Sequence, residues 1–327
     1  MRNNLLNILI KVIIIIRTIS MASISKILIR KVPNTKLGIS EPPPSWFGNE
    51  ENICLPTWTN KNWLKSRFHF SFAEYNNPRN VQFGVLRVMN DDLVQPKRGF
   101  GTHPHRDVEI CTYIVDGFLT HKDSMGTAET LSRGSIQFMS AGTGVEHSEH
   151  NLNENPLRFI QIWINTRQRG LKPVYGSLKG NDADRLNRWS HLVQDIKNAD
   201  IDAPIKINQD ANILGRDALL SLLSLLSLLS LLIIIIIIII IIKKKVSEIE
   251  PGKSLNFEIK GDRQGYLLCI EGDNNTIQGK ESTITLSRHD AAEIIGPQML
   301  NITTSNDKSH FLLVEMKHEI GSGRTDL

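Results

Sequence analysis

Residues 109–139 read EICTYIVDGFLTHKDSMGTAETLSRGSIQFM, and residues 265–294 read GYLLCIEGDNNTIQGKESTITLSRHDAAEI. Each stretch runs from one strand-like segment through a glycine turn into a second, and then through the tripeptide LSR into a third. Gly, Asn and Asp stand between the segments, as strand boundaries require. The repetition predicts two similar β-barrels in tandem.

The same pattern continues outward from both stretches. Further strand-like segments are SKILIRKV, WLKSRFHFSFAEY, VQFGVLRVMN, LRFIQIWINT, IKINQDANIL, SLNFEIK and HFLLVEMK. Helical periodicity is weak, so we expect an all-β chain of two antiparallel barrels with a low-complexity insertion in the second. The predicted divisions are an N-terminal barrel at 21–170, a polar connector at 171–196 and a C-terminal barrel at 197–327.

Residues 1–20 form an extension or a targeting segment. Residues 1–40 carry seven Lys or Arg and no Asp or Glu, a composition that resembles a mitochondrial transit peptide. The alternatives are an upstream extension with Met21 as the start that the fold needs, a secretion signal, or a membrane anchor. The predicted location is therefore the cytoplasm, the nucleus or both, with the mitochondrion as the alternative.

The insertion at about 216–245 contains four Leu-Leu-Ser repeats followed by a run of isoleucine and three lysines. Its uncharged part, residues 219–242, is long enough to cross a bilayer. However, if the segment joins two strands of one closed sheet, its ends must lie close together, whereas a span would separate them by roughly 30 Å. We therefore favour an inserted loop, with no membrane association.

Charge and cysteine content exclude several classes of protein. The net charge of +4 is spread along 327 residues, so no direct nucleic-acid binding is predicted. The three cysteines are widely spaced, which suggests no disulfide framework and fits a reducing compartment. No CxxC pair exists to hold structural zinc.

His103 and His105 are two residues apart and precede a strand-like segment. In a strand, residues i and i+2 face the same side, so both imidazoles should project together. His147 and Glu149 repeat this spacing about forty residues later, after Gly142 and Gly144 allow a tight turn.

If these two strands are neighbours in one barrel, three imidazoles and one carboxylate converge on a single cation. That set suits iron, manganese, nickel, copper or zinc, whereas magnesium or calcium would want more oxygen ligands. Octahedral coordination would leave two open positions for an anionic oxygen ligand and O₂.

Other histidines and one glutamate compete for a role. We expect His121 to be a loop or rim residue, and His150 to face away because its parity is opposite to that of His147. His69 lies in an alternating aromatic segment and reads as a core histidine. Glu109 is either a fourth ligand or, as we prefer, a hydrogen-bond acceptor for a ligand imidazole.

Six longer motifs carry a resemblance. WLKSRFHFSFAEY, FGVLRVMNDDLVQP, RGFGTHPHRDVEICTYIVDG, HKDSMG, MSAGTGVEHSE and QIWI closely resemble the pirins, and the bacterial pirin-like quercetin dioxygenases are the nearest type. The strong similarity covers about 58–175. It implies a bicupin, which consists of two barrels of the double-stranded β-helix type. The N-terminal cupin would bind the metal, and the C-terminal cupin would be metal-free.

The resemblance also implies a site and a reaction. The metal ligands carry over onto His103, His105, His147 and Glu149, and Fe(II) is the favoured metal among the first-row divalent ions. The implied function is a metal-dependent flavonol (quercetin) 2,4-dioxygenase, which opens an aromatic heterocycle with O₂ and releases carbon monoxide. Its partners would be a flavonol-like small molecule and O₂, with Glu149 taking the flavonol's proton.

Two other functions stay open. One is an iron-dependent regulatory protein, similar to pirins that act as transcription co-regulators, with a protein partner. The other is a degenerate protein, since the Leu-Ser and poly-Ile repeats suggest relaxed constraint, although all four ligand residues are retained.

Overall fold

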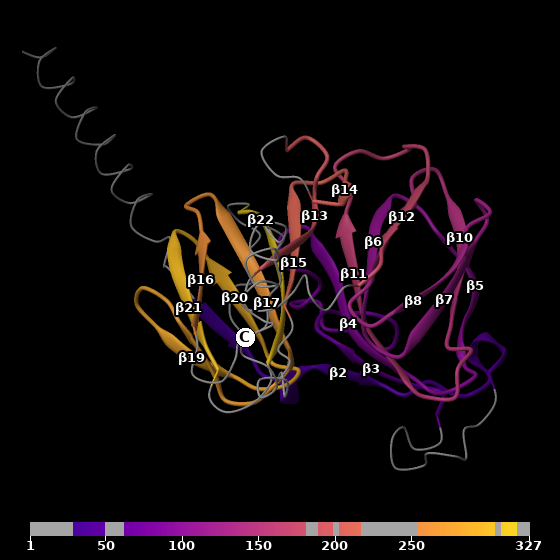
Figure 1. Cartoon of the computed structure of the whole chain (residues 1–327), viewed down its shortest axis with the longest axis horizontal. Coiled ribbons are helices and arrows are strands. Elements are labelled where there is room, and N and C mark those ends of the chain that lie inside the picture. The colour runs from indigo at the N-terminus through magenta and orange to yellow at the C-terminus, as the bar shows by residue number, and fades with distance from the viewer. Residues whose placement is uncertain are drawn as a thin grey trace, which may run out of the picture.

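The structure is a computed structural model that describes residues 29–49, 62–180, 189–198, 203–216, 254–304 and 309–318. These residues form strands and turns, with two short 3-10 helices and no α-helix among them. They make an N-terminal half, mostly purple and magenta, and a C-terminal half, mostly orange and yellow, which lie side by side (Figure 1). The predicted all-β fold class is confirmed.

The N-terminal half contains eleven of the described strands, and the two 3-10 helices flank its first strand along the chain. These elements are η1 (Asn34–Lys36), β2 (Gly38–Ser40), η2 (Trp46–Gly48), β3 (Leu64–Phe68), β4 (Leu86–Val94), β5 (Gly99–His105), β6 (Val108–Asp116), β7 (Phe118–Asp123), β8 (Ala128–Ser132), β9 (Ile136–Ser140), β10 (Val145–His150), β11 (Leu157–Asn165) and β12 (Val174–Leu178).

The C-terminal half also contains eleven of the described strands, one of which comes from the beginning of the chain. They are β1 (Ile29–Val32), β13 (Ser190–Asp195), β14 (Ile205–Ile207), β15 (Ala211–Arg216), β16 (Ser254–Ile259), β17 (Arg263–Glu271), β18 (Asn275–Gln278), β19 (Thr283–Leu286), β20 (Ala291–Ile295), β21 (Gln298–Thr303) and β22 (His310–Lys317).

Each half pairs a seven-stranded sheet with a four-stranded one. The N-terminal sheets have the orders β12-β9-β6-β11-β4-β3-β2 and β5-β10-β7-β8. The C-terminal sheets repeat this plan as β1-β20-β17-β22-β15-β13-β14 and β16-β21-β18-β19. The two stretches with the LSR tripeptide become β6 to β9 and β17 to β20, so the predicted tandem bicupin is confirmed.

Strand β6 shows why these segments are apolar along their whole length. Its even positions, such as Ile110 and Ile114, pack in the core clusters of the N-terminal half. Its odd positions Cys111, Tyr113 and Val115 pack in a core shared with the C-terminal half. Both faces of the strand are therefore buried, and a strand buried on both faces reads as a continuous apolar run.

The shared core joins the two seven-stranded sheets face to face, and we call this contact the seam. Apolar side chains of β4, β6 and β11 meet those of β15, β17 and β22 there. Hydrogen bonds that cross it include one between Tyr113 Oη and His310 Nε2 at 3.0 Å and one between Tyr266 Oη and His69 Nδ1 at 2.9 Å. His69 is fully buried, as expected of a core histidine.

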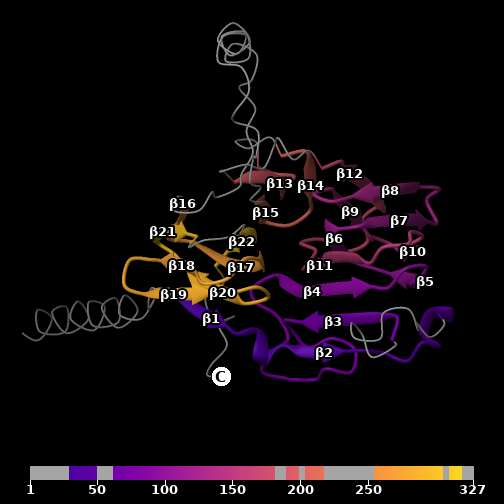
Figure 2. The ribbon, with the colours of Figure 1, turned by 60° about the horizontal axis from the view of Figure 1, so that its bottom comes forward.

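Strand β1 belongs to the C-terminal half although it precedes the N-terminal half in the sequence. It pairs antiparallel with β20, placing Ile29 opposite Ile294, and Figure 2 shows the indigo strand at the edge of the orange and yellow sheet. The first described residues therefore complete the C-terminal sheet rather than the N-terminal one.

The segment predicted to be a polar connector carries two strands instead. β12 pairs with β9 of the N-terminal half, and β13 pairs with β14 and β15 of the C-terminal half. β12 is an edge strand whose residues are exposed or half-buried, so it lacks the apolar alternation by which strands are recognised.

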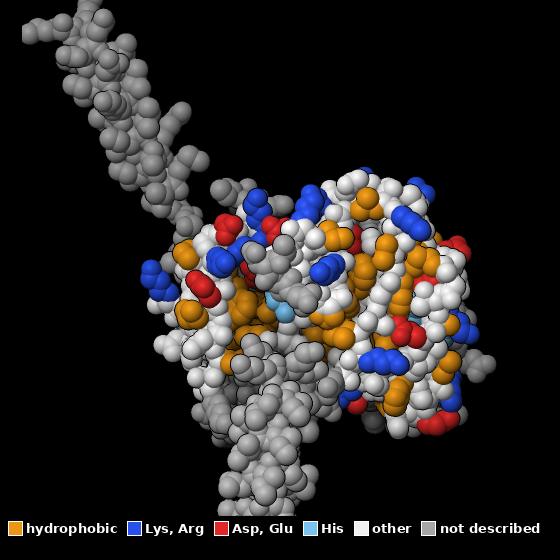
Figure 3. Space-filling model, turned by 45° about the horizontal axis from the view of Figure 1, so that its top comes forward, with side chains coloured by type: hydrophobic (Ala, Val, Ile, Leu, Met, Phe, Trp, Pro, Cys, Tyr) orange, Lys and Arg blue, Asp and Glu red, His pale blue; other side chains and the backbone are white. Residues whose placement is uncertain are grey.

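Two predicted segments, residues 1–20 and the main part of the insertion, lie outside the described residues. β15 ends at Arg216 before the insertion, and β16 begins at Ser254 after it. Within the described part, no helix has the length and apolarity needed to cross a membrane. Figure 3 shows acidic and basic side chains interspersed on one face, with hydrophobic side chains gathered near its middle.

Candidate metal centre

Three of the four predicted ligand residues meet on the inner face of β5 and β10. These strands are antiparallel neighbours, and His103 lies directly opposite His147. Their imidazole centroids are 4.5 Å apart, and each lies 4.8 Å from the centroid of His105. One ring nitrogen from each of the three histidines lies within 4.8 Å of the others. This is a spacing at which one cation could contact all three.

Glu149 lies beside this cluster on the same face of β10. One oxygen of its carboxylate and one ring nitrogen each of His147 and His121 lie within 4.8 Å of one another. Three neighbouring side chains hold it: Gln137 Nε2 donates to Oε1 at 2.6 Å, Thr112 Oγ1 donates to Oε1 at 3.1 Å, and Gln161 Nε2 donates to Oε2 at 2.9 Å. The carboxylate is therefore fixed in place next to the histidines.

Burial and neighbouring side chains keep the imidazoles of His105 and His147 neutral. Burial lowers the pKa of His105 to about 3, and the neighbouring His147 and His103 add to this shift. Burial and the neighbouring His103 and His121 likewise lower the pKa of His147 to about 3. Neutral imidazoles have a free lone pair, which is the form that binds a metal.

Several ring nitrogens of the cluster are buried with nothing to bind. His105 Nε2 and both ring nitrogens of His147 have no hydrogen-bond partner among the described residues. His103 Nδ1, in contrast, contacts the carbonyl oxygen of Gly101 at 2.7 Å, which orients its ring. A buried polar atom without a partner is costly, so the donor set fits a divalent transition metal, which would satisfy these nitrogens.

His121 departs from the expectation of a rim position. It lies on β7, opposite Glu149, and its side chain is 1% exposed. Its Nε2 contacts Asp123 Oδ2 at 3.0 Å, and its ring stacks on Tyr175 at a centroid distance of 4.6 Å. Strand β10 lies between β5 and β7 in the sheet. His121 therefore belongs to the wall of the site.

Glu109 does not take the role that we preferred. It is buried on the side of β6 that faces away from the histidines, and its Oε1 accepts a hydrogen bond from Ser140 Oγ at 3.1 Å. Burial raises its pKa, while hydrogen bonds from Thr166 and the backbone of Asn208 partly offset that shift. Its hydrogen-bond partners therefore lie outside the histidine cluster, and it does not orient an imidazole.

His150 faces away from the site, as predicted. It is half-buried, and its ring packs where a side chain at Gly99 would stand.

A cavity of about 210 Å³ opens beside the cluster and reaches His103, His105 and Glu149. Its walls are largely aromatic, formed by Trp46, Phe47, Trp63, Phe68, Phe72, Phe100 and Trp163. Phe100 and His103 both line it although they are three residues apart, because the pairing of β5 with β10 contains a bulge at this point. Such a pocket suits a flat aromatic molecule.

Sequence reasoning missed the polar residues that surround Glu149. Gln137, Gln161 and Asp92 come from β9, β11 and β4, and only the pairing of these strands brings them to the site. Asp92 lines the cavity and accepts a hydrogen bond from Ser66. Its pKa is raised to about 8, mainly by burial and also by the nearby charges of Asp91 and Glu149. The hydrogen bond from Ser66 opposes this shift.

The C-terminal half has apolar residues at the matching positions. β21 has the same burial pattern as β10, and Leu300 and Ile302 stand where β10 has His147 and Glu149. Phe257 and Ile259 of β16 pair with β21 as His103 and His105 pair with β10. No group of three metal-binding side chains forms in the described part of this half.

Comparison with known proteins gives the family. The sequence model named Pirin matches residues 52–164, and the model of the quercetinase C-terminal cupin domain matches residues 243–316. A pirin-like protein of Caulobacter vibrioides is 33% identical over 245 residues, which cover 75% of this chain and 89% of that protein. The chain belongs to the pirin family.

Several relatives of this pirin carry an enzyme name. A protein of Zymomonas mobilis with the provisional name quercetin 2,3-dioxygenase is 34% identical over 77% of this chain and 91% of its own length. Quercetin 2,3-dioxygenase of Escherichia coli is 48% identical over 41% of this chain and 67% of its own length.

Solved structures agree on the fold. A bacterial pirin of Escherichia coli in complex with nickel(II) has a TM-score of 0.64 and 24% identity, and the match covers 89% of this chain and all of that one. The bicupin architecture described above is therefore the one that pirins share.

Proposed function

We propose that this pirin is a metal-dependent dioxygenase of the quercetin type, which opens the heterocycle of a flavonol-like substrate with O₂. The observation that carries the proposal is the cluster of three converging imidazoles beside an aromatic cavity. The names of the relatives supply the substrate class, and the cavity is suited to a flat aromatic ring.

His103, His105 and His147 would hold one divalent transition metal, and Fe(II) is the ion that we favour. Glu149 would complete the ligand set or stand next to the ion as a base. The metal would supply positive charge that favours the flavonol's 3-oxyanion, together with a route for electrons to O₂. Carbon monoxide would leave as both atoms of O₂ enter the ring-opened product.

The chain's own residues would bind the substrate and move its proton. Glu149 can accept the proton of the 3-hydroxyl, because Gln137 and Gln161 hold its oxygens at the edge of the cavity. The rings of Trp163 and Phe100 would flank the flavonol and exclude water.

The test compares four variants on strand β10. We expect His147→Ala to lose bound iron and to bleach quercetin at least about 100-fold more slowly. We expect Glu149→Gln to lower kcat/KM by about 10² to 10⁴ when fully loaded with iron, because the base is gone. His150→Ala and Glu146→Gln are matched controls, since neither side chain lines the aromatic cavity.

The assay follows quercetin absorbance with iron-loaded protein in air and under nitrogen. Bleaching that needs both oxygen and iron supports the proposal. Full iron occupancy without oxygen-dependent bleaching would refute the activity and would favour a binding role for the same metal site.

A further inference from the structure

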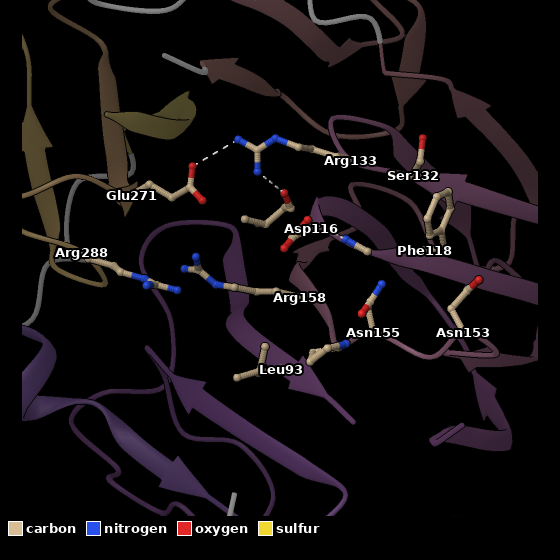
Figure 4. Close-up of a pocket in the computed structure, with 13 residues that line it drawn as sticks. Leu93, Asp116, Phe118, Ser132, Arg133, Asn153, Asn155, Arg158, Glu271 and Arg288 are labelled. Carbon is tan, nitrogen blue, oxygen red and sulfur yellow. Dashed lines mark hydrogen bonds and ion pairs between the residues drawn. The ribbon is translucent and has the colours of Figure 1, made fainter. Parts of the chain in front are cut away.

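A second, larger cleft lies at the seam between the two halves, away from the histidine cluster. Its volume is about 590 Å³, and residues of both halves line it. Three of these are arginines: Arg133 and Arg158 from the N-terminal half and Arg288 from the C-terminal half (Figure 4). The proposed dioxygenase reaction uses none of them.

Two of the arginines come from the repeated tripeptide LSR. Arg133 follows β8 and Arg288 follows β19, and the next residue in each turn, Gly134 or His289, has a positive φ of 76° or 70°. The two halves therefore build the same turn and place equivalent arginines at the seam. Asp116 and Glu271 are an equivalent pair of acids, each standing just before a glycine turn.

Only one of the two arginines has an acid partner. Arg133 Nη2 lies 3.2 Å from Glu271 Oε2, which makes an ion pair across the seam. By the same relation, Asp116 would be the ion-pair partner of Arg288. Its carboxylate instead accepts a hydrogen bond from the backbone N–H of Gly117. The Arg288 guanidinium has no hydrogen-bond or ion-pair partner within the described part of the chain.

Arg158 adds a second unused donor. It is 4% exposed, and its Nε and Nη2 donate to the carboxylate of Asp91 at 2.8 and 2.7 Å. Its Nη1 is buried and has no hydrogen-bond partner among the described residues. In Figure 4 the guanidinium groups of Arg158 and Arg288 point toward each other across the cleft.

We propose that this cleft binds a small organic anion, whose carboxylate or phosphate group lies between Arg158 and Arg288. The Nη1 of Arg158 and the guanidinium of Arg288 are the unused donors, and planar guanidinium donors match the oxygens of either group. The adjoining side chains of Leu93 and Phe118 offer apolar surface to the rest of the molecule. The bound anion would take the place that Asp116 leaves empty.

The experiment is calorimetric titration of the full chain, loaded with metal, at constant ionic strength. Inorganic phosphate and benzoate are the two probes. We expect saturable binding of at least one of them at one site per chain. Binding of phosphate alone assigns a phosphate ester, binding of benzoate alone assigns a carboxylate, and binding of both supports the shared oxyanion chemistry.

Arg288→Gln should weaken binding at least about tenfold, because one of the two charges is lost. Arg79→Gln, which removes an equally exposed arginine outside the cleft, should leave the affinity unchanged. Asp116→Asn should tighten binding several-fold, because it removes a competing negative charge from the lining. Metal content and quercetin turnover should be the same in all three variants.

Absence of saturable binding of either probe would overturn the proposal. So would an Arg288→Gln protein that binds as tightly as the unaltered chain, or an Asp116→Asn protein that binds more weakly.

Discussion

At the scale of single residues, Asp92 stands out because a buried acid lines the aromatic cavity. It is 4% exposed, and burial raises its pKa to about 8. In the unfolded chain the same carboxyl would titrate near pH 3.9. The folded protein therefore holds a proton on Asp92 over a range of pH in which the unfolded chain does not.

This difference makes the free energy of unfolding depend on pH through Asp92. When the folded pKa of an acid lies above its unfolded value, the folded state binds more protons, so stability falls as the pH rises between the two values. We expect the unaltered protein to lose stability through Asp92 between about pH 4 and pH 8. The Asp92→Asn variant lacks that loss.

Urea unfolding at pH 5, 6, 7 and 8 measures the effect. The free energy of unfolding of Asp92→Asn, relative to the unaltered chain, should rise with pH by up to about 1.4 kcal/mol per unit. Asp116→Asn controls for the change of net charge, because Asp116 is exposed. A difference that does not vary with pH would show that Asp92 has no raised pKa.

Some residues of the site could be predicted from the sequence, and others could not. Alternation along one strand placed His103 beside His105 and His147 beside Glu149, and the convergence of the three histidines followed from pairing those strands. His121 and Gln161 could not be placed, because their positions depend on the register of β7 and β11 against β10 and β6. Register is a long-range property that a single strand does not carry.

At the scale of elements, the close contact of β5 with β10 positions the cluster. A side chain at Gly99 would place its Cβ 2.4 Å from the carbonyl oxygen of Glu149 and 2.6 Å from the Cα of His150. Both contacts are with backbone atoms of the neighbouring strand. The two strands can therefore approach each other only because residue 99 is glycine.

Gly99→Ala should push β5 away from β10. We expect it to lower the free energy of unfolding by about 1–3 kcal/mol and to weaken metal binding, because His103 would move relative to His147. Gly101→Ala is the matched control, since its nearest contact would be 3.3 Å away. Urea unfolding of the metal-free protein and competition with a chelator measure the two effects.

If both alanine variants behave alike, the close approach at Gly99 does not support the cluster.

Elements of the fold were predictable where burial imposes a pattern. The strands of the LSR repeat were found because their apolar residues recur in the same order in both halves. β12 was missed because an exposed edge strand has no apolar face to mark it. The partner of β1 was unpredictable, since Ile29 and Ile294 are joined only by the tertiary fold.

At the scale of the whole molecule, the seam makes the two halves depend on each other. Cys111 belongs to the shared core, and Cys269 lies in the core of the C-terminal half. Both are buried free thiols, and burial raises the pKa of each. Neither should react with an alkylating reagent while the protein is folded.

We expect the two cysteines to become reactive at the same urea concentration, because loss of the shared core exposes both halves together. Brief labelling with iodoacetamide in increasing urea, followed by mass spectrometry of the peptides, measures each thiol separately. A Cys54→Ser background removes the third thiol. Labelling of Cys269 at clearly lower urea than Cys111 would show that the C-terminal half unfolds by itself.

The placement of β1 also has a consequence during translation. Ile29 leaves the ribosome 265 residues before Ile294, its partner on β20. At about 5–20 residues per second, β1 waits roughly 13 to 53 s for that partner. During that wait β1 has no partner, and without β1 the edge of β20 is open to pairing with other chains. An expression vector that starts the gene after codon 32 would leave this edge open permanently and should send much of the product into inclusion bodies.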